Sequence, residues 1–308
     1  MKKPKALKFG DTIGVIAPSS PCSEKNVEES IKALEELGFK VKLGESCRHK
    51  RGYLAGPDVV RANDINKMFK DPEVDGIICI RGGYGATRIL RDLDLKSIKH
   101  NPKVFVGYSD ITALHSAFNS ICKMVTFHGP MVSSNFIGEN DVYSVENLLK
   151  NIMDTEPIGD IINPEKEEME FLVKGKAKGK IVGGNVSLLV ASIGTEFEFD
   201  VKGKILFLED IDETPLRLDR MIVQLRDSGK LKDCEGIILG DFANCDDLSE
   251  NSLTLEQVFI DLLSDLCKPV ITNLKSGHCH PMVTIPFGVD AIIDSEKKTF
   301  KIIENAVV

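Results

Sequence analysis

Between residues 12 and 127, short apolar runs alternate with segments of helical periodicity. Residues 12–17, 75–80 and 103–106 are rich in β-branched and aromatic side chains, which is typical of buried strands. Between the first two runs, Val27, Ile31 and Leu34 recur at the spacing of an amphipathic helix. This alternation predicts βα units on a mainly parallel sheet.

The stretch 103–118 carries the clearest chemical signal in this half of the chain. Its strand ends at Gly107, and the spacing of Ile111, Leu114 and Phe118 indicates a helix directly afterwards. Ser109 therefore lies on an abrupt strand-to-helix turn, which is the setting of a nucleophile elbow. The usual elbow is G-x-S-x-G, and the second glycine is missing here. A helix N-cap is the alternative role for this serine.

The loop at 81–85, with sequence RGGYG, follows another predicted strand. In parallel sheets, ligands bind where strands end and the following loops open. Gly82 and Gly83 would allow a ligand to approach the backbone closely. The alternative is a turn with tight helix packing.

The composition bounds the class of protein. A length of 308 residues corresponds to two domains at about 150 residues each. A net charge of -8 without a basic block argues against a nucleic-acid partner. No run has the length of a signal peptide or of a membrane span, and the eight cysteines contain no C-x-x-C pair. We therefore expect a cytoplasmic protein with reduced cysteines and no membrane association.

Charged, flexible sequence between residues 155 and 180 marks the domain boundary. We predict an N-terminal domain at 1–160, a linker at 161–175 and a C-terminal domain at 176–308. Alternating lysines at 176–182 are typical of a solvated edge strand. The second domain mixes strands and helices less regularly, and its end at 289–303 suggests a closing hairpin.

The second half supplies an acid and a base for Ser109. An apolar strand at 204–208 ends in Glu209, while Asp210, Asp212 and Glu213 are expected to favour the N-terminus of the next helix, which Thr214 and Pro215 begin. His278, in a loop after a short strand, is the best of six histidines as a base, and His280 is second. The order serine, acid, histidine is that of α/β-hydrolases.

The other histidines have simpler explanations. His115 falls on an apolar helix face and is expected in the core, whereas His128 either lines the site or occupies a turn. The spacing of His278 and His280 is weak evidence for a metal without a third ligand. We expect neither a metal nor a cofactor.

Six motifs together resemble the LD-carboxypeptidase family, the S66 serine peptidases. They occur in the family's order and spacing and are ICIRGGYGATRIL, VGYSDITAL, TFHGPM, GGNVSLL, LFLEDIDETPLRLDRMI and SGHCHPMVTIPFG. The resemblance implies a flavodoxin-like α/β N-terminal domain and a smaller, β-rich α/β C-terminal domain. It also implies a catalytic triad of Ser109, Glu209 and His278.

The resemblance further implies release of the terminal D-alanine from cytoplasmic muropeptides during cell-wall recycling, by an enzyme that forms homodimers. The bond broken joins an L-centre of lysine or diaminopimelate to D-alanine. A second branch of the family hydrolyses microcin-type acyl-sulfamoyl adenylates through aromatic contacts to the nucleoside. The absence of Trp and the presence of only four Tyr disfavour that branch here.

The expected mechanism assigns further residues. The N–H groups of Asp110 and of the Gly82–Gly83 turn, chiefly Gly83, would stabilise the oxyanion. Arg81 or Arg88 would pair with the product carboxylate, and Gly82 and Tyr84 would contact the substrate. The competing hypothesis is a non-catalytic protein of two α/β lobes that closes on a small anion.

Overall fold

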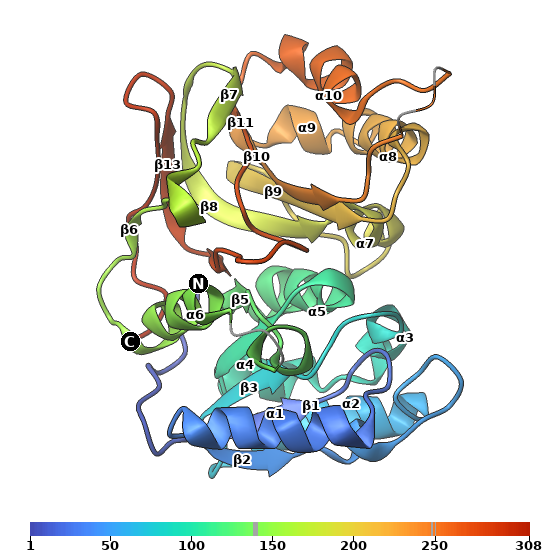
Figure 1. Cartoon of the computed structure of the whole chain (residues 1–308), viewed down its shortest axis with the longest axis vertical. Helices are drawn as coiled ribbons and strands as arrows, with labels where there is room; N and C mark the ends of the chain where they lie inside the picture. The colour runs from blue at the N-terminus through green and yellow to red at the C-terminus, as the bar shows by residue number, and fades with distance from the viewer. Residues whose placement is uncertain (138–140, 248, 250) are drawn as a thin grey trace.

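The computed structural model describes residues 1–137, 141–247, 249 and 251–308, and these form two sheets (Figure 1). The first sheet lies in the lower half of Figure 1. In spatial order its strands are β12 (Ile285–Phe287), β5 (Thr126–His128), β4 (Val104–Gly107), β3 (Gly76–Cys79), β1 (Thr12–Ile16) and β2 (Lys40–Leu43).

Strands β1 to β5 of this sheet are parallel. Their spatial order 2-1-3-4-5 is that of flavodoxin-like folds, which confirms the predicted N-terminal architecture. The crossover segments contain α1 (Glu24–Glu36), α2 (Asp58–Lys70), α3 (Ala86–Ile89), α4 (Leu95–His100) and α5 (Thr112–Ala117), and α6 (Val142–Met153) follows β5. Ser23 caps α1 as its sequence suggests, because its hydroxyl accepts the Asn26 N–H at 3.1 Å.

The second sheet occupies the upper half of Figure 1. In spatial order its strands are β6 (Gly159–Asp160), β14 (Thr299–Ile302), β13 (Asp290–Asp294), β8 (Lys176–Asn185), β9 (Lys204–Ile211), β10 (Gly236–Ala243), β11 (Val270–Thr272) and β7 (Glu170–Val173). Strands β8 to β11 are parallel, and antiparallel strands flank them.

The expected hairpin is present as β13 and β14. The edge-strand interpretation of 176–182 is wrong, because β8 lies between β13 and β9 in the middle of the sheet. Its lysines alternate with buried residues because only one face of its first half is solvated.

Helices cover one face of the second sheet. They are α7 (Val186–Ser192), α8 (Pro215–Asp227), α9 (Lys230–Asp233) and α10 (Leu255–Leu263). Leu218 and Ile222 of α8 pack with Leu206 of β9 in one apolar cluster. None of the described helices combines the length and apolar character needed to cross a bilayer.

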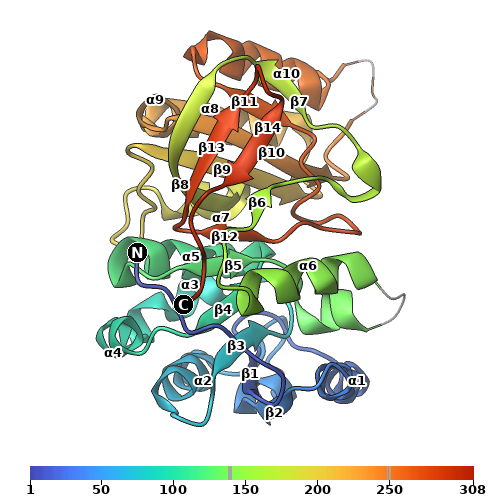
Figure 2. The same ribbon diagram turned by 90° about the vertical axis from the view of Figure 1, so that its left-hand side faces the viewer.

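The opposite face of the second sheet packs on the first sheet in a shared core. Phe127 of β5, Phe207 of β9 and Phe287 of β12 all belong to this core. Strand β12 pairs antiparallel with β5, although it is close to the C-terminus of the chain (Figure 2). The predicted division at 161–175 stays a prediction. In the structure this segment contains β7. Strand β12, late in the chain, pairs with β5 of the first sheet.

Candidate active site

Ser109 sits on the turn between β4 and α5. It has a φ of 64°, a left-handed conformation that costs a non-glycine residue about 1–2 kcal/mol. Tyr108 and Asp110 on either side are buried, whereas Ser109 is partly exposed. The backbone strain therefore lifts the serine hydroxyl out of the core, as a nucleophile elbow does.

The glycine loop after β3 lies against this serine. A Cβ added to Gly82 would come within 2.9 Å of the Ser109 Cβ, so only glycine fits without a shift. Gly83 has a φ of 118°, and a Cβ there would overlap the Ser20 hydroxyl. Among the described residues, no acceptor pairs with the backbone N–H of Gly83 or Asp110. Both donors are therefore available to a ligand.

The Asp110 side chain has a different task from its backbone. Its Oδ2 accepts the Ser19 hydroxyl at 2.6 Å and the Ala86 N–H at 2.8 Å, which ties together the loops after β1 and β3. Burial raises the pKa of this carboxyl, and these two hydrogen bonds oppose that shift. Asp110 thus braces the glycine loop beneath Ser109.

The buried Arg61 supports the same loops. Its guanidinium donates to the carbonyl oxygen of Gly85 at 2.8 Å and also to that of Pro18. Its charge favours the ionised form of Asp110. The sequence pattern does not reveal this role of Arg61, because an arginine in an amphipathic helix ordinarily predicts an exposed face.

Glu209 and His278 form the second half of the site. Glu209 lies near the end of β9, fully buried, and its Oε2 is 2.7 Å from Nδ1 of His278. Gly277, with a φ of 124°, allows this approach, since a Cβ there would lie 2.9 Å from the same carboxylate oxygen. The hydrogen bond leaves the other ring nitrogen, Nε2, free to take a proton.

The pKa values of this pair shift together. Burial raises the pKa of Glu209, and its hydrogen bond to His278 offsets part of that shift. Burial favours the neutral form of His278, but its hydrogen bond to Glu209 and the charges of Glu209, Asp210 and Asp241 raise the pKa of His278 overall. The raised pKa of Glu209 and the raised pKa of His278 both favour the form of the pair that keeps a proton.

Tyr108 brings the two halves of the site together. Its ring packs edge-on against the His278 ring, with centroids 5.0 Å apart. His278 is thereby adjacent to the residue that precedes Ser109. No hydrogen bond joins Ser109 Oγ to the imidazole among the described residues. Catalytic contacts of this kind often tighten only when substrate binds.

The remaining predicted substrate contacts differ in their surroundings. Arg81 is exposed, and its guanidinium makes one long hydrogen bond, 3.4 Å to the Pro21 carbonyl, within the described part of the chain. Tyr84 is exposed too, and its ring packs against that of Tyr53. Arg88 is held by two-pronged hydrogen bonds to Asp58, so Arg81 is the freer of the two candidate arginines.

The structure corrects the assignment of Asp210. Its carboxylate accepts the Asn185 amide at 2.8 Å and the Ser187 N–H at 3.0 Å, so it serves the start of α7 and not that of α8. Thr214 caps α8 as predicted.

The surroundings of three other histidines test their predictions. His115 is buried, as predicted, but His128 neither lines the surface of the site nor occupies a turn, because it is the last residue of β5 and fully buried. His280 is exposed and contacts Asp141 at 3.4 Å. Across the described ranges, no group of three or more His, Cys, Asp or Glu side chains is arranged to hold a metal ion.

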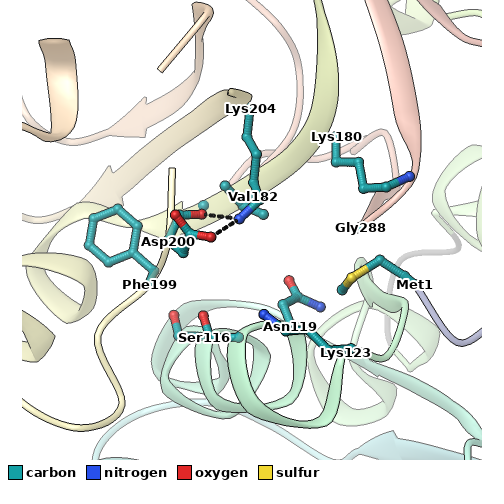
Figure 3. Close-up of a pocket in the computed structure, with 12 residues that line it drawn as sticks. Met1, Ser116, Asn119, Lys123, Lys180, Val182, Phe199, Asp200, Lys204 and Gly288 are labelled. Atoms are coloured by element: carbon teal, nitrogen blue, oxygen red, sulfur yellow. Dashed lines mark hydrogen bonds and ion pairs between the residues drawn. The ribbon is translucent and has the colours of Figure 1, made fainter. Parts of the chain in front are cut away.

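A separate cavity of about 190 Å³ lies between the two halves (Figure 3). Lys204, at the start of β9, forms one wall and bonds to Asp200 at 2.6 Å. Lys180 pairs with Glu304 at 2.8 Å. Because Glu209 is five residues further along β9, the Lys204 wall of this cavity lies roughly 16 Å from Glu209 along the strand.

The chain is a two-domain α/β protein. Its site combines a paired glutamate and histidine with a serine on a strained turn. The chain belongs to the LD-carboxypeptidase family: the family's N-terminal domain model matches residues 13–129 and its C-terminal domain model matches residues 178–293.

Relatives and solved structures resemble the whole chain. A probable murein peptide carboxypeptidase of Bacillus subtilis is 45% identical over 303 residues, with 96% of this chain and 93% of that protein covered. The muramoyltetrapeptide carboxypeptidase of Oxalobacter formigenes has a TM-score of 0.85 and 30% identity, with 96% and 100% coverage. The microcin self-immunity protein MccF in complex with aspartyl sulfamoyl adenosine has a TM-score of 0.93 and 26% identity, with 100% of both chains covered.

Proposed function

We propose that this protein is a cytoplasmic serine carboxypeptidase that releases terminal D-alanine from muramoyl tetrapeptides. The observation that carries the proposal is the 2.7 Å hydrogen bond from His278 to buried Glu209, beside the strained turn of Ser109. The names of the similar carboxypeptidases from Bacillus subtilis and Oxalobacter formigenes support a murein-peptide substrate.

In the proposed reaction, Ser109 attacks the carbonyl carbon of the L-residue that precedes D-alanine. His278 takes the serine proton on Nε2 and later gives it to the leaving amine. Glu209 holds the imidazole in the tautomer that this transfer requires. Water then attacks the acyl-enzyme, and His278 acts as base again.

The backbone N–H groups of Gly83 and Asp110 are the proposed oxyanion hole. Both are close to Ser109, since Asp110 is its neighbour and Gly82 packs on its side chain. In other hydrolases, loss of one such donor costs on the order of 3 kcal/mol of transition-state stabilisation. The side-chain bonds of Asp110 to Ser19 and Ala86 keep this loop in place.

A groove of about 570 Å³ beside the site is suited to the rest of the peptide. It is lined by Ser134, Asn135, Asp141, Tyr143 and His280, among others. Ser134 lies near the Tyr108 phenol, and His280 is two residues from His278. The mixed polar and apolar lining of the groove suits a peptide chain better than a purely apolar ligand. Arg81 is the proposed partner of the D-alanine carboxylate.

The test is release of D-alanine from a purified tetrapeptide muropeptide, with wild type and Ser109→Ala compared. We expect release by wild type and loss in the variant, with Ser133→Ala as a matched serine control on a neighbouring loop. Release that persists in Ser109→Ala would move the nucleophile elsewhere. A serine-directed fluorophosphonate probe adds a second readout, because a non-catalytic binding protein would not be labelled.

A second candidate activity is hydrolysis of acyl-sulfamoyl adenylates. The TM-score of 0.93 to MccF bound to aspartyl sulfamoyl adenosine favours it, while the small number of aromatic side chains in this chain disfavours nucleoside stacking. Turnover of such a compound by a wild type that leaves the muropeptide intact would decide for this activity.

We also propose that the protein works as a homodimer, as its family resemblance implies. Sedimentation at micromolar concentration distinguishes a dimer from a 33.9 kDa monomer. A monomeric sedimentation coefficient that persists in the active enzyme would contradict this part of the proposal.

A further inference from the structure

Strand β10 contains a bulge directly opposite the catalytic glutamate of the proposed triad. In the ladder with β9, Leu239 pairs with Leu208 and Phe242 pairs with Asp210, so Gly240 and Asp241 together oppose Glu209. Leu239 and Phe242 pack in the same apolar cluster although they are three residues apart. In a regular strand Asp241 would share the face of Leu239; the extra residue turns it toward the face of Glu209.

Asp241 lies against the loop that carries His278. Its backbone N–H donates to the Ser276 carbonyl at 2.8 Å, and the charge of its carboxylate acts on Lys275, His278 and Cys279. The aspartate is neither fully buried nor fully exposed. It is therefore close to His278 and partly open to solvent.

The carboxylate of Asp241 is unpaired within the described ranges of the chain. Neither a hydrogen bond nor an ion pair reaches its side-chain oxygens from the described part of the chain, and Lys275 is paired with Glu167 at 3.1 Å. Burial raises the pKa of Asp241. A partly desolvated carboxylate gains from a donor that a bound ligand supplies.

Two other carboxylates near His278 are already engaged. Glu209 is bonded to His278, and Asp210 is bonded to Asn185 and Ser187. Among the described carboxylates near His278, Asp241 is thus the one with no side-chain oxygen in a hydrogen bond or ion pair. A carboxylate in that position selects a cationic group.

We infer that Asp241 is a specificity residue that binds the side-chain ammonium of the substrate residue whose carbonyl Ser109 attacks. This inference rests on the proposed function, because a muropeptide carries a diamino acid at that residue. The side chain extends from the carbon next to the reacting carbonyl, so its amine lies within one side-chain length of His278 when Ser109 attacks. The ion pair would form only when the substrate binds, and it explains why the bulge places an unpaired acid here.

The experiment compares tetrapeptides whose diamino residue has a free or an N-acetylated side-chain amine. D-Alanine release gives kcat/KM for each, and their ratio measures the preference for the free amine. We expect wild type to prefer the free amine and Asp241→Asn to lose about 10- to 100-fold of that preference, mainly through KM. Asp241→Glu should keep a preference, because it keeps the charge.

The matched control is Asp246→Asn, which removes the same charge from the exposed loop after β10. A preference that stays at the wild-type value in Asp241→Asn would overturn the inference and leave the carboxypeptidase proposal intact. A wild type that releases D-alanine equally from both peptides would also overturn the inference and leave the carboxypeptidase proposal intact. A wild type that releases D-alanine from neither peptide would instead contradict the proposed function, and this inference with it.

Discussion

The backbone N–H of Asn185 donates a hydrogen bond of 3.0 Å to the hydroxyl of Thr112. Both residues are buried, and each lies at a strand-to-helix junction of a different sheet. Thr112 begins α5 after Ser109, and Asn185 ends β8 before α7. The Asn185 side chain also donates to Asp210, the neighbour of Glu209. A short polar chain thus connects the serine turn with the strand that carries the acid.

We expect Thr112→Val to lower the free energy of unfolding by about 1–3 kcal/mol, because it leaves the buried Asn185 N–H without an acceptor. We also expect a lower kcat, since the serine turn and the glutamate strand lose their connection through Asn185. Denaturant unfolding and D-alanine release measure the two effects. Thr112→Ser keeps the hydroxyl and is the control; equal losses in both variants would show that packing, not the hydrogen bond, is responsible.

Glu209→Gln tests the electrostatics of the proposed base. The charge of Glu209 helps to raise the pKa of His278, and the imidazole must be neutral to accept the serine proton. Activity should therefore fall as the pH falls through this pKa. Removal of the charge lowers the pKa and should move the acidic limb of the kcat/KM profile to lower pH, while kcat falls by up to about 10⁴-fold.

The control for that profile is Glu213→Gln, which removes a nearby charge that pairs with Arg217 and not with His278. Its acidic limb should stay at the wild-type position. An unchanged limb in Glu209→Gln would mean that a group other than His278 controls the profile.

Gly82→Ala tests the contact between the glycine loop and the serine. The new Cβ would lie 2.9 Å from the Ser109 Cβ and 3.1 Å from its Oγ, so the hydroxyl must move. Displacement of a reacting group by even 1 Å can cost about 100-fold in rate. We expect a loss of this order in kcat, together with slow fluorophosphonate labelling and a retained thermal transition. Labelling at the wild-type rate would show that Ser109 is not crowded.

Arg81→Ala tests recognition of the D-alanine carboxylate. Arg81 is exposed and weakly held, so its guanidinium is free to form a two-pronged pair with a carboxylate. We expect KM to rise about tenfold or more with a smaller change in kcat, and Arg81→Lys to recover part of the loss. Arg88→Ala should leave KM unchanged because Asp58 already binds Arg88. An unchanged KM in Arg81→Ala would remove Arg81 from the site.

Local sequence patterns are sufficient to predict the positions of Ser109 and Glu209. The apolar run before Gly107 and the helical spacing after Asp110 predict the turn that carries Ser109, and the structure has it with a φ of 64°. Glu209 was found by the same logic, since it follows an uninterrupted apolar strand. Both predictions depend only on neighbours in the chain, which is why periodicity reveals them.

Long-range contacts were beyond the sequence. Asp241 was not singled out, because a bulge is visible only when β10 is aligned with β9. Asp210 was assigned to the wrong helix because its partners, Asn185 and Ser187, are more than 20 residues away along the chain. The loop position of His278 ranks it first among six histidines, but its pairing with Glu209 was implied only by the family resemblance. The prediction for His128 is wrong because the pairing of β5 with β12 joins distant segments.

The pairing of β12 with β5 has a consequence for how the protein is made. Residues 126–128 leave the ribosome long before residues 285–287. Since domains near the N-terminus start to fold during synthesis, the first sheet must wait with an open strand edge while strands β6 to β11 of the second sheet are translated. An edge of this kind invites pairing with another chain. The nascent protein therefore depends on rapid completion of its own C-terminal end, or on a chaperone, to protect β5.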